Sequence, residues 1–163
     1  MNTLPCGRKR NAHASKNPQK SLEWKAILNK YLKEKNLRST SQREKVAEMI
    51  FAKKSHFEVQ TLIKEVQTKY PDIGPATVYR SVKTLCEAGL LHESLQSHSG
   101  VTLYEAHEEE HHDHLVCLDC GEIFEFHDES LEDAQNKAIK KMGFNQAKHK
   151  HVIYAKCTLL QKK

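Results

Sequence analysis

The sequence predicts an α+β protein in two parts: a helical first part that ends in a β-hairpin, and a smaller α/β second part. Three observations support this prediction. Apolar residues recur at helical spacing between about residues 21 and 88, and two short extended runs follow them. Beyond about residue 113 the apolar spacing changes to the period of two that is typical of strands. A chain of 163 residues has room for two small domains, which we expect at residues 21–104 and 105–163.

The segment before the first helix differs from the rest of the chain. Residues 1–20 carry five Lys or Arg among Asn, Ser, Pro and Gly, and they show no apolar period. Because such a segment cannot bury enough apolar surface to fold, we expect a disordered basic arm.

Four helices are expected between residues 21 and 88. The second begins near Ser41, with Glu44 as the partner in a capping box, and the third covers about residues 58–69 and ends before Pro71. The fourth covers about residues 76–88, between Pro75 and Gly89. The apolar positions that we expect to be buried are, helix by helix, Trp24, Ile27, Leu28, Tyr31 and Leu32; Val46, Met49 and Ile50; Val59, Leu62, Ile63 and Val66; and Val78, Val82, Leu85 and Cys86.

The fourth helix leaves a polar face. This face consists of Thr77, Tyr79, Arg80, Lys83 and Thr84. Extended runs at residues 90–95 and 101–104 then predict a hairpin. Helices followed by a hairpin indicate a winged helix-turn-helix, in which the fourth helix enters the major groove of DNA and the hairpin lies beside the backbone.

The second part is expected to begin with a hinge at residues 105–113 and to continue as short strands on both sides of the Cys-x-x-Cys-Gly unit at residues 117–121. A helix over about residues 129–142 should end at Gly143, and a last strand should run from about residue 151 to 157. The expected buried side of that helix is Leu131, Ala134, Ala138 and Ile139. Because this part has few core residues, we expect a second copy to complete it in a homodimer.

Charge is distributed unevenly along the chain. The balance of Lys and Arg against Asp and Glu is +9 over residues 1–104, −12 over residues 105–133 and +8 over residues 134–163. A basic first part favours a polyanionic partner, and an acidic middle favours cations. No apolar run approaches the roughly 18 residues of a membrane span, and the N-terminus lacks the apolar stretch of a secretory signal, so we expect a cytoplasmic protein without a membrane partner.

Cysteine and histidine spacing predicts metal binding. Cys117 and Cys120 are placed as in zinc knuckles, and Cys157 is the plausible third thiol of a structural zinc site that needs four ligands. Every residue from 107 to 114 is His, Asp or Glu. In an extended segment, His112 and His114 share one face and His111 and Asp113 share the other, so the stretch can supply two sites for Fe²⁺, Mn²⁺, Co²⁺ or Zn²⁺.

Two other classes of function stay open at this point. His107 and His111 fit the His-Glu-x-x-His pattern of metal-dependent hydrolases, but the stretch has no apolar face to hold the helix that this pattern requires. A metal-storage protein would not need the exposed Tyr, Arg and Lys of the fourth helix. A DNA-binding regulator rather than an enzyme is therefore the preferred interpretation.

Three stretches together resemble the ferric uptake regulator family of metal-dependent repressors, over about residues 37–157. They are Gly74-Pro-Ala-Thr-Val-Tyr-Arg80, His111-His-Asp-His-Leu-Val-Cys-Leu-Asp-Cys-Gly121, and Glu125-Phe126. The resemblance implies a dimeric repressor that binds a double-stranded DNA operator when a regulatory metal, Fe²⁺ first and Mn²⁺ or Zn²⁺ as alternatives, closes a hinge between its two parts. Zinc- and peroxide-responsive members share the fold and remain alternatives.

The resemblance also implies roles for individual residues. The regulatory site would comprise His56, Glu105, His112, His114 and Glu125, and a second site His111, Asp113, Glu132 and His149. The structural zinc would use Cys117, Cys120 and Cys157, without the second C-terminal cysteine pair that many members have. Contacts with DNA would come from Arg38, Thr77, Tyr79, Arg80 and Lys83.

Overall fold

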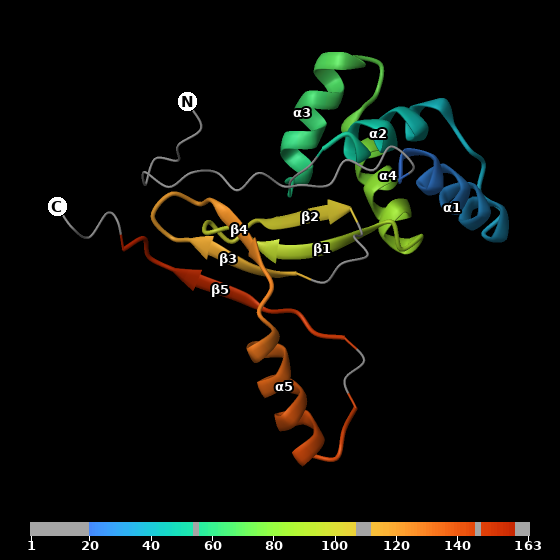
Figure 1. Cartoon of the computed structure of the whole chain (residues 1–163). Coiled ribbons are helices and arrows are strands. Elements are labelled where there is room, and N and C mark those ends of the chain that lie inside the picture. Colours follow the sequence, from blue (N-terminus) through green and yellow to red (C-terminus); the bar gives the residue numbers. More distant parts are fainter. Residues whose placement is uncertain (1–19, 54–55, 107–111, 146–147, 159–163) are drawn as a thin grey trace. The chain divides into compact units, whose positions relative to one another are not determined.

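The computed structural model describes residues 20–53, 56–106, 112–145 and 148–158 (Figure 1). These residues form two compact units, one before and one after residues 107–111. The predicted α+β class is confirmed. Residues 1–19 of the expected arm lie outside the described residues, and Lys20 belongs to the first helix.

The first unit consists of four helices followed by a two-stranded antiparallel hairpin. The helices are α1 (Lys20–Glu34), α2 (Ser41–Phe51), α3 (Val59–Lys69) and α4 (Pro75–Glu87), and the strands are β1 (Leu91–Gln96) and β2 (Thr102–Ala106). Pro75 occupies the first turn of α4, where its missing N–H is not needed. Gly89 takes a φ of 70°, a left-handed conformation that glycine adopts without steric cost, and it ends the α4 segment before β1.

The core of this unit follows the helical period. Trp24 stacks on Phe51 with ring centroids 4.9 Å apart, and Leu62, Val66, Val78 and Leu85 are completely buried. Tyr31, Met49, Val59 and Cys86 are only partly buried, and they pack against the edge of the core.

Two positions in these helices were predicted wrongly. Ile27 is 46% exposed, because the buried stripe of α1 is narrower than expected and runs through Trp24, Leu28 and Leu32. Thr84 is only 7% exposed, and its hydroxyl donates to the carbonyl of Arg80 at 2.8 Å, which satisfies the hydroxyl within the helix.

The start of α2 also differs from the prediction. Thr40 is the N-cap residue, and its side chain accepts a hydrogen bond from the N–H of Arg43. Glu44 accepts from the hydroxyl of Ser39 at 2.8 Å, so the expected capping box with Ser41 is replaced by a cap that lies one residue earlier.

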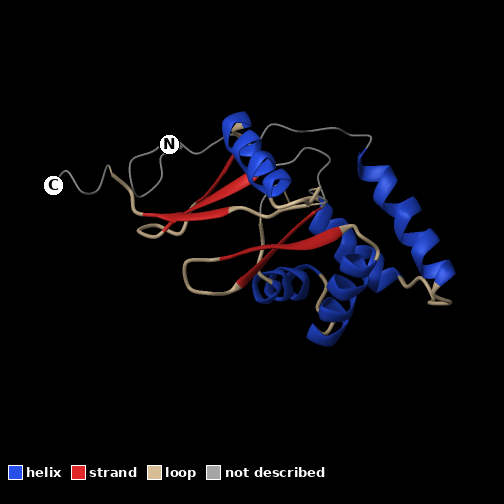
Figure 2. Ribbon diagram, turned by 90° about the horizontal axis from the view of Figure 1, so that it is seen from below, coloured by secondary structure: helices blue, strands red, loops and turns tan. Residues whose placement is uncertain are grey.

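The second unit is a three-stranded sheet with one helix (Figure 2). The strands are β3 (Asp113–Cys117), β4 (Ile123–Phe126) and β5 (Val152–Ala155), in the order β4-β3-β5, and α5 (Glu129–Lys141) connects β4 to β5. β3 pairs antiparallel with β4 and parallel with β5. The expected bounds of the hinge, residues 105–113, were wrong at both ends, because Glu105 lies in β2 and Asp113 lies in β3, and residues 107–111 lie outside the described residues.

Asp128 caps the N-terminus of α5. Its carboxylate accepts hydrogen bonds from the hydroxyl of Ser130 and from the N–H groups of Ser130 and Leu131. These hydrogen bonds, the Ser130 hydroxyl first, lower the pKa of Asp128 below its usual value. The stabilisation of α5 is therefore present above the usual pKa and is lost as pH falls through the lowered one.

The second unit has a small core. Val116, Cys117 and Cys157 are the apolar or thiol side chains of its described residues that are fully buried. The prediction for α5 was wrong, since Leu131 and Ile139 are half-buried and Ala134 and Ala138 are exposed. In one chain the apolar side of α5 has too little opposing surface to cover it.

Among the described residues, no helix combines the length and apolar character needed to cross a bilayer.

Replacing Leu85 by Ala should destabilise the first unit by about 2–5 kcal/mol, because a completely buried side chain leaves a cavity. Ile27→Ala is the matched control and should have little effect, since Ile27 lies 46% exposed. Urea unfolding followed by the fluorescence of Trp24 measures both free energies. Equal losses in the two variants would contradict the burial described here.

Candidate metal centres and DNA-binding face

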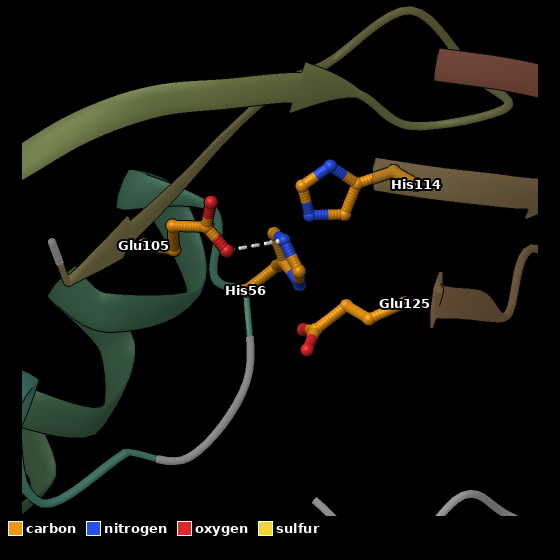
Figure 3. Close-up of side chains that lie close together, drawn as sticks. All are labelled: His56, Glu105, His114 and Glu125. Atoms are coloured by element: carbon orange, nitrogen blue, oxygen red, sulfur yellow. Dashed lines mark ion pairs between the residues drawn. The ribbon is translucent and has the colours of Figure 1, made fainter. Parts of the chain in front are cut away.

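The first candidate metal centre begins with a pair in the first unit, His56 and Glu105. The backbones of Phe57 and Tyr104 exchange two hydrogen bonds of 2.9 Å, which bring the residue before Phe57 next to the residue after Tyr104. His56 Nε2 consequently lies 2.6 Å from Glu105 Oε2 (Figure 3). Both side chains are almost fully buried.

A third side chain reaches the same carboxylate. His92 of β1 is the direct cross-strand partner of Glu105 of β2, and its Nε2 lies 2.8 Å from Glu105 Oε1. The two carboxylate oxygens thus face two different imidazoles.

The other predicted members of the regulatory set lie in the second unit. His114 of β3 is the cross-strand partner of Glu125 of β4, and Figure 3 shows both side chains. The ring of His112 meets the ring of His114 edge-on, with centroids 4.9 Å apart. This contact agrees with the expectation that His112 and His114 share one face of an extended segment.

The second candidate centre lies within the second unit alone. Ligand atoms of Asp113, Glu132 and His149 all lie within 4.8 Å of one another. His149 Nε2 is 3.0 Å from Glu132 Oε1 and 3.6 Å from Asp113 Oδ1, and the Asp113 side chain is only 1% exposed. The fourth predicted member, His111, lies outside the described residues, as does the His107–His111 motif.

His151, just before β5, is a further neighbour of this centre. Its Nδ1 lies 3.8 Å from Asp113 Oδ2, the oxygen that does not face His149.

The candidate zinc site is built on a turn after β3. Gly121 has a φ of 72° and donates its N–H to the carbonyl of Cys117 at 2.8 Å, which closes the turn that carries Cys117 and Cys120. The N–H of Cys157 donates to the carboxylate of Asp119, which lies between Cys117 and Cys120 in the sequence. Cys117 and Cys157 are buried together, with Cys120 packed against them, so the described residues offer three thiols.

Cys86 differs from these three. It lies on α4 in the first unit, where burial, followed by the charges of Glu93 and Glu87, raises the pKa of its thiol to about 11. This thiol stays protonated at neutral pH, and a protonated thiol is a poor nucleophile and a poor metal ligand.

The predicted DNA-binding residues are placed on the surface of the first unit. On α4, Arg80 and Lys83 are exposed, Tyr79 is 46% exposed and Thr77 is half-buried. The amide of Gln60 on α3 donates to the hydroxyl of Tyr79 at 2.7 Å and orients that ring. Arg38 is exposed just before α2.

The donor types fit the metals that the sequence suggested. Three clustered thiols suit zinc. Imidazole combined with carboxylate suits Fe²⁺, Mn²⁺ or Zn²⁺, and both centres contain that combination. Sequence reasoning did not single out His92 or His151 as site residues. The hairpin register opposite Glu105 and the two-residue spacing from His149 were the signals that could have indicated them.

Known proteins share the sequence pattern and the fold of this chain. The sequence profile of the Ferric uptake regulator family matches residues 34–157. The chain is 36% identical over 128 residues to the Ferric uptake regulation protein of Cupriavidus metallidurans, covering 78% of this chain and 89% of that protein.

Two solved structures have the same fold. The ferric uptake regulator of Helicobacter pylori, described as having three functional metal binding sites, aligns with a TM-score of 0.74 at 26% identity over 86% of this chain and 95% of that one. The regulator of Pseudomonas aeruginosa, solved with manganese, aligns with a TM-score of 0.66 at 28% identity, over 81% and 98%.

Zinc loading should protect Cys117, Cys120 and Cys157 from iodoacetamide, and a strong chelator should expose them, because coordinated thiolates are not available for alkylation. Cys86 serves as the internal control: at pH 7.5 it should react slowly in both states, and faster only as pH approaches about 11. Peptide mass spectrometry measures each rate. Equal rates with and without chelator at the three clustered cysteines would contradict a zinc site there.

Proposed function

The chain belongs to the ferric uptake regulator family, and from this membership we propose that it is an Fe²⁺-responsive transcriptional repressor that binds DNA as a dimer. Membership in the family makes it a metal-responsive regulator. Four properties are proposed beyond family membership: a preference for iron, repression of an operator, a dimer and a cytoplasmic location.

The observation that carries the proposal is the Glu105 carboxylate, buried between imidazoles in the first unit. The proposed regulatory set adds His112, His114 and Glu125 from the second unit. A bound divalent ion would supply positive charge that offsets the clustered carboxylates. Residues from two units that share one ion would fix the angle between the units, and with it the spacing of two α4 helices in a dimer.

Iron is the preferred regulatory metal for two reasons. Mixed imidazole and carboxylate donors suit Fe²⁺ and Mn²⁺, and relatives at 36% identity are named for ferric uptake. Zinc is the alternative that the same donors allow, since Zn²⁺ binds nitrogen and oxygen ligands more tightly than Fe²⁺.

Recognition of DNA is assigned to α4. Arg80 and Tyr79 project from its first half, where the N-terminal residues of a recognition helix meet base edges. Lys83 lies one turn further on, in a position suited to a phosphate. Thr77 and Arg38 complete the proposed contacts with the operator.

A dimer is proposed through the second unit. Ile153 and Tyr154 are exposed on β5, an edge strand of the sheet, and Phe144 is exposed after α5. An edge strand beside exposed apolar side chains is a surface that a second copy can extend and cover.

Glu105→Gln and His114→Ala should each weaken metal-stimulated binding to DNA by roughly 5–150-fold, the usual range of coupling between two ligands. Fluorescence anisotropy with a metal-selected operator, titrated with Fe²⁺ under anaerobic conditions, measures the effect. Glu129→Gln, an exposed carboxylate outside all three candidate sites, is the control and should behave as the parent. Sedimentation should show that each variant keeps the parent's oligomeric state. Parental operator affinity in Glu105→Gln at saturating metal would overturn the proposal.

Arg80→Ala and Lys83→Ala should have different effects on DNA binding. Loss of an arginine that contacts bases should cost about 1–3 kcal/mol of discrimination between operator and random DNA. Loss of a lysine that contacts phosphate should weaken binding to both DNAs equally and reduce the salt dependence of binding. Binding titrations over a range of salt concentrations separate the two effects, and the same salt slope and specificity in both variants would contradict the assignment of α4.

A further inference from the structure

We propose that His92 is the positioning residue for the regulatory carboxylate: its imidazole holds Glu105 in the orientation from which the carboxylate binds the regulatory ion. This inference rests on the proposed function and adds to it a residue on the hairpin. The observation behind it is that each oxygen of Glu105 faces a histidine, one from β1 and one from the segment before α3.

The register of the hairpin places His92 for this role. His92 and Glu105 are direct partners in the antiparallel β1–β2 pair, so their Cβ atoms lie on the same face of the hairpin. The distance of 2.8 Å from His92 Nε2 to Glu105 Oε1 is that of a good hydrogen bond. β1 and β2 are also paired on both sides of this position, at Leu91–Ala106 and Glu93–Tyr104, so the contact is supported by backbone pairing.

The two histidines have different consequences when an ion binds. His56 faces Oε2 and is a member of the proposed ligand set, so its nitrogen must give up any proton before it can coordinate. His92 faces Oε1 and can keep its N–H bond to that oxygen. One oxygen is then available for the ion while the other stays fixed, an arrangement in which outer hydrogen bonds orient a ligating carboxylate.

Burial makes this orientation matter. The Glu105 side chain is only 10% exposed, whereas the His92 side chain is 45% exposed. A carboxylate with little access to water depends on hydrogen-bond donors from the protein. His92 therefore provides a donor from the solvent side without filling the space on the side of His56.

The test measures binding of Co²⁺ to the full-length protein with zinc in its cysteine site. The part of the visible Co²⁺ d–d absorption that the parent shows and Glu105→Gln lacks is assigned to the regulatory site. His92→Ala should weaken Co²⁺ binding at that site by about 10–100-fold, the usual loss when an outer partner of a ligand is removed. His92→Gln, whose amide can donate to the same oxygen, should restore most of the affinity. His98→Ala removes an exposed histidine from the turn of the same hairpin and should bind Co²⁺ as the parent does.

The outcomes separate this inference from the proposed function. Parental affinity in His92→Ala, with binding lost in Glu105→Gln, would overturn the positioning role and leave the proposed function intact. Tighter Co²⁺ binding in His92→Ala would also overturn the positioning role, because it would mean that His92 competes with the ion for the Glu105 carboxylate. Equal weakening in the Ala and Gln variants would overturn the hydrogen-bonding role. If Glu105→Gln keeps all of the parent's Co²⁺ absorption and affinity, Glu105 binds no ion, and both this inference and the proposed function are overturned. Thermal melting of the metal-free variants by circular dichroism reports any loss of folding separately.

Discussion

The register of β3 is the constraint on which the candidate sites of the second unit depend. Within five residues this strand supplies Asp113, His114 and Cys117, one to each of three ligand sets. Antiparallel pairing with β4 brings Glu125 opposite His114. Parallel pairing with β5 places Ala155 opposite Cys117, and Cys157 follows two residues later. Because side chains alternate between faces, a slip of one residue would separate all three sets together.

The second unit has candidate metal ligands where a larger domain would have core residues. Asp113 and His114 are buried on β3 together with Val116, and α5 has no fully buried side chain. Burying a carboxylate costs free energy unless charge and hydrogen bonds compensate for it. Metal binding at these positions would therefore contribute to the folding free energy of the unit as well as to its regulation. The first unit instead has a continuous apolar core from Trp24 to Leu91.

The periodicity of the sequence was enough to predict the elements, because each helix of the first unit has neighbours within the same chain to bury its stripe. It failed for Ile27 and Thr84, where the width of a buried stripe depends on which helix packs against it. It failed more completely for α5, which has no fully buried residue because its apolar side meets too little opposing surface among the described residues of one chain. The candidate metal ligands were predicted from residue type and from the family resemblance. His92 was overlooked because its proposed role comes from a cross-strand pairing, and its own sequence neighbours give no indication of it.

The position of Glu105 explains how a small ligand could affect a distant helix face. Glu105 lies on β2, and His56 lies three residues before α3, so the pair joins the hairpin to a helix that packs on α4. The backbone bridge between Phe57 and Tyr104 makes this junction stiff. An ion held there cannot move without moving α3 and the hairpin, and α4 packs against both. Close-packed units of this kind transmit displacement instead of absorbing it, because their interiors have little empty space. The candidate ligands of the first unit thus lie on segments that adjoin or belong to the elements packed against the proposed DNA-reading helix.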